Sequence, residues 1–211
     1  MARPSDASSP SGPRSAAQPL MAPWRLSYMD MLSRAEKQSS QGGAKAGAGA
    51  GAGAASSFLR AYWLDPAGDE ANHVIVRTGT EQTGRGGLIL LNRYPYANGH
   101  LLVCLGEARS RVLEYDEARR AELWSLVDLA VHLVERGLEP QGVNVGLNQG
   151  AAAGAGVPGH IHVHVVPRWA GDVNFMEACA QIRVIPSALE DMARRMREVW
   201  RSLEAEGHGR A

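Results

Sequence analysis

Three histidines in the last third of the chain alternate with aliphatic residues. His160, His162 and His164 are separated by Ile161 and Val163. Because successive side chains of a β-strand point to opposite faces, an extended segment over 160–164 would place all three imidazoles on one face, with neighbouring ones about 6.6 Å apart. Packing of an apolar core does not select three polar rings in a row. The spacing therefore predicts a chemical site.

Two chemistries fit imidazoles on one strand. They could bind zinc together with a ligand from elsewhere in the chain. Alternatively, one neutral ring attacks phosphorus as a nucleophile, provided that a hydrogen bond to its other nitrogen fixes the tautomer. The segment 150–159, directly before the histidines, consists almost entirely of glycine and alanine. Backbone N–H groups of such a loop can close around phosphate oxygens, so the combination favours phosphorus chemistry.

The elements that must hold these residues are indicated by hydropathy patterns. Apolar residues at helical spacing predict a long helix over 117–135, with Asp116 capping its start and Gly137 its end, and an amphipathic helix over 189–203. Apolar runs predict strands over 73–77, 88–92, 101–105, 143–147 and 161–166. This order predicts an α+β domain with a mainly antiparallel sheet, one long central helix and a C-terminal helix.

The domain is expected to span 58–205, followed by a short tail over 206–211. Residues 1–57 contain little that could form a core and include a Gly-Ala tract over 39–57, which predicts a mostly disordered, low-complexity extension. Within this extension, the segment 22–32 carries Trp24, Leu26 and Met29. We expect it to dock on the domain or on a partner subunit, because these side chains would form a sticky patch if exposed.

Composition excludes several classes of protein. The 211 residues include 22 Lys and Arg against 22 Asp and Glu, whereas a protein that neutralises nucleic-acid phosphates broadly would be basic. No apolar run approaches the roughly 20 residues of a membrane span, and the first residues do not resemble a secretory signal. Cys104 and Cys179 are too few for a disulfide framework. We therefore expect no nucleic-acid partner, no membrane span and a cytoplasmic location.

The segment 160–166, HIHVHVV, resembles the signature of the histidine triad (HIT) superfamily, His-φ-His-φ-His-φ-φ with φ apolar, at every position. The segments 22–25, 91–101, 167–169 and 171–176 are similar to the bacterial branch related to diadenosine tetraphosphate phosphorylases. The resemblance spans about residues 22–200 outside the Gly-Ala tract. It implies a HIT-like fold, a homodimer, and transfer or hydrolysis of nucleoside monophosphates through a nucleotidyl-histidine intermediate. The helix over 117–135 could supply the dimer contact, or its apolar stripe could pack inside one subunit.

The resemblance also implies roles for individual residues. His162, the middle histidine, would attack the α-phosphorus. His160 and His164 would flank it, with His164 donating a hydrogen bond to the phosphate or to the leaving oxygen. Asn148 would open the phosphate loop. The backbone of that loop would bind phosphate at Gly154, Ala155, Gly156 and Val157.

Three further residues complete the nucleotide site that the resemblance implies. Asn92 would hold the ribose hydroxyls, and Leu91 with its apolar neighbours would sandwich the base. Arg168 could lend charge to a polyphosphate, although a surface arginine fits this position equally well. The expected substrate is a dinucleoside polyphosphate of the diadenosine tetraphosphate type, cleaved by phosphorolysis or hydrolysis. A nucleoside phosphoramidate hydrolase and a nucleotide-binding protein with little turnover are the alternatives.

Many bacterial relatives in this superfamily bind zinc through a Cys-x-x-Cys pair, a histidine after the Gly-His strand, and a triad histidine. The corresponding positions here are Ser56, Leu59 and Ala108, none of which is a ligand of such a site. Cys104 and Cys179 lack a matching spacing and are expected to be packed thiols. The resemblance thus leads us to expect no metal and no cofactor.

Overall fold

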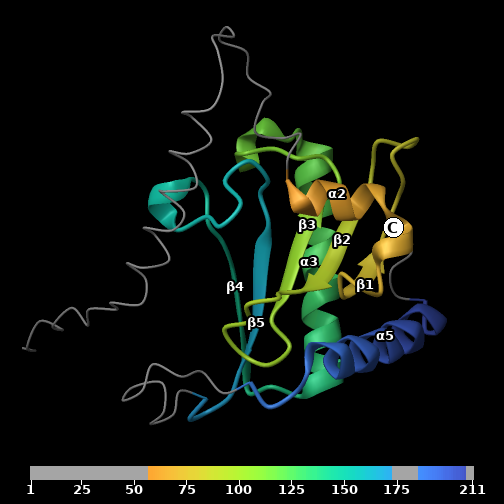
Figure 1. Ribbon diagram of the computed structural model, residues 1–211, viewed down its shortest axis with the longest axis vertical. Coiled ribbons are helices and arrows are strands. Elements are labelled where there is room, and N and C mark those ends of the chain that lie inside the picture. Colours follow the sequence, from red (N-terminus) through yellow and green to blue (C-terminus); the bar gives the residue numbers. More distant parts are fainter. Residues whose placement is uncertain (1–56, 173–184, 208–211) are drawn as a thin grey trace, which may run out of the picture. The chain divides into compact units, whose positions relative to one another are not determined.

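The computed structural model describes residues 57–172 and 185–207. In this part of the chain, a five-stranded sheet has the order β1-β2-β3-β5-β4, and every pair of neighbouring strands is antiparallel (Figure 1). The strands are β1 Val74–Arg77, β2 Gly87–Leu91, β3 Leu101–Leu105, β4 Gly142–Leu147 and β5 Val163–Arg168. The α+β class and the antiparallel sheet that the sequence predicts are confirmed.

The middle of the sheet is buried on both faces. Every residue of β2 and β3 is buried, because α3 (Glu117–Leu138) covers one face and α2 (Phe58–Leu64) covers the other (Figure 1). Such strands have continuous apolar sequences rather than alternating ones. At the opposite extreme, β4 forms one edge of the sheet, pairs with β5, and is largely exposed.

Helix α3 begins where the sequence predicts, but it ends later. The side chain of Asp116 accepts a hydrogen bond from the Arg119 N–H over 2.8 Å and caps the N-terminus. Gly137 does not end the helix; it is a buried residue inside it. A Cβ at this position would lie 3.3 Å from the sulfur of Met196 and from a methyl of Val199. Gly137 is therefore a packing position, and the backbone leaves the helix at Glu139, which has a φ of 48°.

The apolar stripe of α3 packs inside the subunit. Helix α5 (Leu189–Ala205) contacts both α3 and β1. Its Met192 and Met196 join Leu123, Ala130 and Leu133 of α3 in a core on the same face of the sheet. This result decides between the two roles that the sequence left open for the stripe.

Helix α2 was not predicted as an element, although the domain was expected to begin at Phe58. Leu59 and Trp63 of this seven-residue helix are buried against Leu88 and Cys104 on the face of the sheet opposite α3. Burial raises the pKa of the Cys104 thiol to about 12, as expected for a packed thiol.

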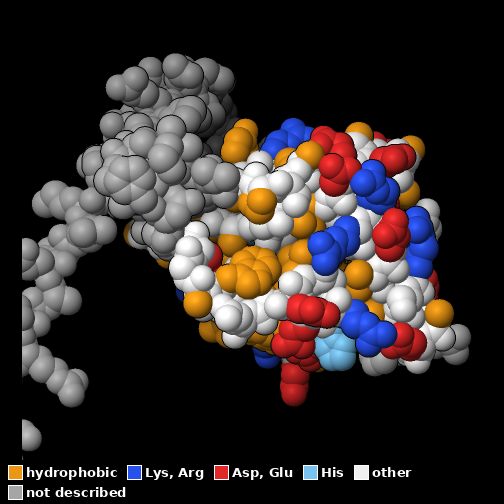
Figure 2. Space-filling view, turned by 90° about the horizontal axis from the view of Figure 1, so that it is seen from below, with side chains coloured by type: hydrophobic (Ala, Val, Ile, Leu, Met, Phe, Trp, Pro, Cys, Tyr) orange, Lys and Arg blue, Asp and Glu red, His pale blue; other side chains and the backbone are white. Residues whose placement is uncertain are grey.

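Several predictions fall outside the described residues. They concern the extension over 1–56 with its docking segment at 22–32, the segment 173–176, Cys179, and the tail over 208–211. Among the described residues, no helix combines the length and apolar character that a membrane span requires. On the face that carries α5, positive and negative side chains are interspersed without a broad patch of one sign (Figure 2).

Candidate active site

The three histidines lie around the start of β5, on the face of the sheet that α2 covers. His164 pairs with Leu102 of β3, and Leu102 packs in the cluster beneath α2. The predicted strand over 161–166 begins too early, because β5 starts at Val163. The His160 N–H bonds to the Val157 carbonyl, and the Ile161 N–H bonds to the Arg109 carbonyl. These two contacts draw the chain into a turn and away from the ladder.

His162 has one ring nitrogen committed as a donor. Its Nδ1 lies 2.9 Å from the carbonyl oxygen of His160, which can only accept, so Nδ1 carries the proton. The Nε2 atom consequently carries the lone pair. Burial lowers the pKa of His162 below its ordinary value, which keeps the ring neutral. This is the tautomer that attack on phosphorus requires.

His160 is fully buried, with both ring nitrogens in hydrogen bonds. Nε2 donates to the Leu105 carbonyl over 2.8 Å, and Nδ1 accepts from the hydroxyl of Ser57 over 2.9 Å. Burial lowers the pKa of His160 to about 4. Both ring nitrogens of His160, which is predicted to flank His162, are therefore already bonded to groups of the protein.

The tautomer of His164 is set by a hydrogen bond with a fourth histidine, His100. The Tyr96 N–H donates to Nδ1 of His100 over 3.1 Å, so Nε2 of His100 carries a proton and donates to Nδ1 of His164 over 3.0 Å. The remaining nitrogen of His164, Nε2, must then carry a proton. Burial, followed by the nearby His162, lowers the pKa of His164 to about 4. His164 therefore presents a neutral N–H donor beside His162, whose ring centre is 5.1 Å away.

The sequence analysis missed His100. The pairing of Leu102 with His164 places His100, two residues before Leu102, on the same face. The tight turn that Asn98 and Gly99 indicate marks the start of β3 in the sequence, but nothing local shows which strand lies beside it.

Asn92 is half-buried next to His100. Its side-chain oxygen accepts from the Tyr94 N–H over 3.0 Å, and its amide nitrogen lies 3.3 Å from Nδ1 of His100. The structure thus brings Asn92 next to the histidine group, and its predicted contact with ribose hydroxyls stays a prediction.

Leu91 lies on the wrong face for the predicted contact with a base. It is buried in the core with α3 and α5, whereas Leu90 and Leu102 share the face of His164. The apolar run of β2 contains leucine on both faces, so the sequence could not identify the one that points toward the histidines. Leu90 and Leu102 are therefore the leucines on the face of His164, where both are buried beneath α2.

The backbone N–H groups predicted to bind phosphate lie in the loop between β4 and β5, and they fall into two groups. The N–H groups of Gly154 and Ala155 already bond to carbonyls inside the loop, and the side chain of Asn148 donates to the Gly154 carbonyl over 3.4 Å. Among the described residues, no acceptor faces the N–H groups of Gly156 and Val157. Of the four predicted backbone donors, these two amides are therefore the ones not used inside the loop.

Arg168 is held by other side chains. Its guanidinium forms a two-point ion pair with Asp172, with distances of 2.6 and 2.8 Å, and also donates to the Asn144 side chain over 3.1 Å. A carboxylate that binds a guanidinium in this way neutralises its charge. The geometry therefore disagrees with the predicted contact between Arg168 and a polyphosphate.

The residues around His160 do not fit the zinc site of the bacterial relatives. Leu59 is a buried apolar side chain, Ala108 offers no ligand atom, and Ser57 occupies one nitrogen of His160. Within the described ranges, no three His, Cys, Asp or Glu side chains are grouped so that they could hold a metal ion.

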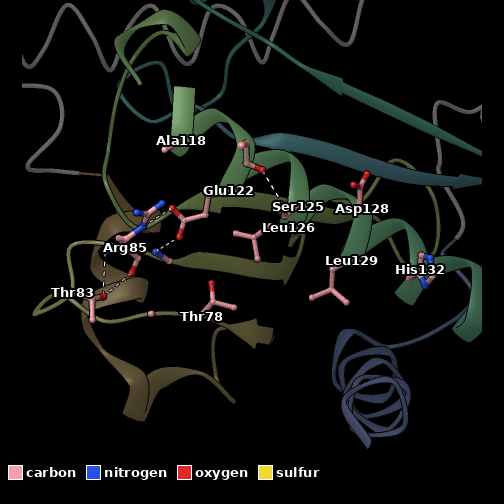
Figure 3. A pocket seen from close by; sticks show the side chains of 13 residues that line it. Thr78, Thr83, Arg85, Ala118, Glu122, Ser125, Leu126, Asp128, Leu129 and His132 are labelled. Carbon is pink, nitrogen blue, oxygen red and sulfur yellow. Dashed lines mark hydrogen bonds and ion pairs between the residues drawn. The ribbon is translucent and has the colours of Figure 1, made fainter. Parts of the chain in front are cut away.

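A hollow of about 720 Å³ lies elsewhere, between α3 and the turn that joins β1 to β2 (Figure 3). It is lined by Leu126 and Leu129 of α3 and by Thr78, Arg85 and Glu122, and it includes none of the three clustered histidines. Leu126 belongs to the core on the α3 face. This hollow is therefore separate from the histidine site.

Comparisons with known proteins identify the proteins to which this chain is similar. A family model described as HIT domain matches residues 85–171. The chain is 32% identical over 189 residues to an AP-4-A phosphorylase of Mycobacterium tuberculosis, which covers 90% of this chain and 87% of that protein. It is 30% identical over 82 residues to a bis(5'-nucleosyl)-tetraphosphatase (asymmetrical) of Schizosaccharomyces pombe, covering 39% of this chain and 44% of that protein. The crystal structure of a zinc-bound histidine triad family protein from Mycobacterium smegmatis aligns with a TM-score of 0.56 and 25% identity, over 72% of this chain and 99% of that one.

Proposed function

Because this chain belongs to the HIT domain family, we propose that it is an enzyme that cleaves dinucleoside polyphosphates through a covalent nucleotidyl-His162 intermediate. The observation that carries this proposal is the fixed tautomer of His162, whose Nδ1 donates to the His160 carbonyl and whose Nε2 lone pair is left to react. The substrate class rests on the relatives, of which one that aligns with 90% of this chain is named AP-4-A phosphorylase.

In the first step, Nε2 of His162 attacks the α-phosphorus of the bound nucleotide. A nitrogen–phosphorus bond forms while the bond from phosphorus to the bridging oxygen breaks. The leaving group takes the electron pair of that bond, and the N–H at Nε2 of His164 donates a hydrogen bond to the departing oxygen. The N–H groups of Gly156 and Val157 would stabilise the phosphoryl oxygens, since preorganised donors lower the barrier most where charge develops.

In the second step, an acceptor oxygen attacks the same phosphorus and releases His162. Inorganic phosphate gives a nucleoside diphosphate, and water gives a nucleoside monophosphate. The covalent intermediate thus divides one difficult displacement into two easier ones. We favour phosphorolysis, because the phosphorylase aligns with most of this chain, whereas the tetraphosphatase aligns with less than half of it.

The nucleoside would bind on the α2 face of the sheet. Leu90 and Leu102 are buried beneath α2 and would back this site from behind, and the half-buried Asn92 supplies a polar group near His164. A pocket that has an apolar side and few polar groups binds a base with modest selectivity.

We also propose a homodimer that forms along β4. This edge strand is largely exposed, including Asn144, Val145 and Gly146, and an unpaired strand edge is a template for pairing with another strand. Burial of the apolar stripe of α3 inside the subunit favours β4 over that stripe as the contact.

Analysis of the products from diadenosine tetraphosphate tests the proposed reaction. With isotopically labelled phosphate present, we expect ATP and ADP, with the label in the ADP; without phosphate, we expect slow formation of ATP and AMP. His162→Gly, which removes the nucleophile but not the pocket, should release no nucleotide. Failure of the wild-type protein to release nucleotide in either buffer would contradict the proposal, and cleavage of adenosine phosphoramidate alone would favour the phosphoramidate hydrolase instead.

A further inference from the structure

Ser57 occupies the N-cap position of α2 but does not cap this helix. Serine at this position commonly accepts a hydrogen bond from an N–H of the first helical turn. Here the Ser57 side chain forms no such bond. Its hydroxyl lies instead 2.9 Å from Nδ1 of His160, a residue 103 positions later in the chain, and the contact is buried. A role of Ser57 as an ordinary helix cap therefore does not fit the geometry.

The hydrogen-bond pattern of His160 requires a donor at the position of Ser57. Because the Leu105 carbonyl can only accept, Nε2 of His160 carries the proton and Nδ1 must accept. His160 is completely buried, so water does not replace a missing donor. An unpartnered buried acceptor is much more costly than an exposed one. The hydroxyl of Ser57 thus fixes both the orientation and the tautomer of the His160 ring.

The backbone of the same residue holds His162. The carbonyl oxygen of His160 accepts the hydrogen bond from Nδ1 of His162 over 2.9 Å. This bond decides which nitrogen of His162 carries the lone pair. The two hydrogen bonds of the His160 ring anchor this residue next to the carbonyl that accepts from His162, and a ring that loses the Ser57 donor can repack and shift that carbonyl.

We propose that Ser57 is a positioning residue for His162, acting through the ring and the backbone carbonyl of His160. The inference rests on the proposed function, in which His162 is the nucleophile, and it adds the residue directly before α2 to the site. Ser57 contacts no reacting atom in this account. Instead, Ser57 raises the fraction of molecules in which the lone pair of His162 lies on Nε2 and points at phosphorus.

Two substitutions of Ser57 and one control in α2 test the proposal. Ser57→Ala removes the hydroxyl, whereas Ser57→Thr keeps a hydroxyl at the same position. Arg60→Met is the matched control, because Arg60 attaches α2 through the Gly106 carbonyl and through Glu81, while Ser57 stays in place. Comparing the three variants separates loosening of α2 from loss of the hydroxyl.

For Ser57→Ala, we expect kcat with diadenosine tetraphosphate to fall about 10- to 100-fold, with KM changed less than about twofold, because misplacement of a reacting group by about 1 Å has effects of this size. Ser57→Thr should restore kcat to within about threefold of wild type, and Arg60→Met should keep wild-type kcat. Equal losses in Ser57→Ala and Arg60→Met would overturn the proposal, as would an unchanged kcat in Ser57→Ala.

A measurement without substrate keeps the inference separate from the proposed reaction. Nitrogen-15 NMR of the ring of His162 should report a single tautomer protonated at Nδ1 in the wild type and in Ser57→Thr, and a mixture of tautomers in Ser57→Ala. A single unchanged tautomer in Ser57→Ala would overturn the role of Ser57. A wild-type protein that shows this NMR pattern but no turnover would instead contradict the proposed function.

Discussion

The Nε2 atom of His100 donates a hydrogen bond to Nδ1 of His164 over 3.0 Å, and this contact determines which nitrogen of His164 carries a proton. The Tyr96 N–H bonds to the other nitrogen of His100 and sets the direction of the donation. The ring of Tyr96 also stacks on His100, with ring centres 4.9 Å apart. His164 is thereby held as a donor toward the space in front of His162.

Replacing His100 should impair departure of the leaving group. His100→Phe retains a ring for Tyr96 to stack on but removes the donor to His164, so kcat/KM for diadenosine tetraphosphate should fall about 100-fold, within the range of general-acid contributions. The p-nitrophenyl ester of AMP, whose leaving group needs little help, should lose much less. Tyr94→Phe is the control, because this side chain is 82% exposed. Equal losses on both substrates would contradict the role of His100.

Acid should destabilise the folded protein through its buried histidines. The pKa of His160 falls from 6.5 to about 4 on burial, so the unfolded chain binds the proton more readily than the folded one. The stability that neutral His160 contributes is complete above pH 6.5 and is lost as the pH falls toward 4. We expect about 2 kcal/mol of this loss by pH 5.

Guanidinium unfolding at pH 7.5, 6 and 5 measures this effect. His160→Gln should lower the stability at pH 7.5 but flatten the dependence on pH. The same pH dependence in His160→Gln and in the wild type would contradict the assignment.

Arg168 should matter little for binding of polyphosphate. Its guanidinium is neutralised by Asp172 and also bonds to Asn144, so we expect Arg168→Met to change KM for diadenosine tetraphosphate by less than about twofold. Steady-state kinetics on the variant measures this. An increase in KM of more than about tenfold would show that the arginine leaves Asp172 to bind substrate.

The edge of the sheet should determine the oligomeric state. Val145 is 42% exposed in β4, and Val145→Lys would place a charge within the proposed strand pairing. Sedimentation should show a dimer for the wild type and a monomer for Val145→Lys. Leu113→Lys, at a position that is 80% exposed outside the sheet, should remain a dimer. A monomeric wild-type protein, or a dimeric Val145→Lys variant, would contradict the interface.

The main strands and long helices could be predicted from the sequence because their signals are local. The apolar run over 101–105 became β3 with the predicted bounds, and Asp116 caps α3. The prediction that Gly137 ends the helix was wrong. A glycine near a helix end can either terminate the helix or leave room for a neighbouring helix, and the local sequence looks the same in both cases. Here Met196 and Val199 approach so closely that a Cβ would require them to shift by a few tenths of an ångström.

The parts of the site that were missed depend on contacts between distant segments. The choice between Leu90 and Leu91 follows from the pairing of β2 with β3. The role of His100 follows from the pairing of β3 with β5, and the role of Ser57 from packing of α2 over the sheet. None of these relationships has a signature at short range, whereas the alternation of the three histidines with aliphatic residues does.

The central claim is that His162 becomes covalently nucleotidylated during turnover. Rapid denaturing quench of the wild-type protein with diadenosine tetraphosphate, followed by peptide mass spectrometry under conditions that preserve phosphoramidate bonds, tests it most directly. We predict the added mass of one AMP on His162, absent from His162→Gly and discharged by phosphate. Continued turnover with no adduct at His162, or an adduct on another residue, would contradict the account.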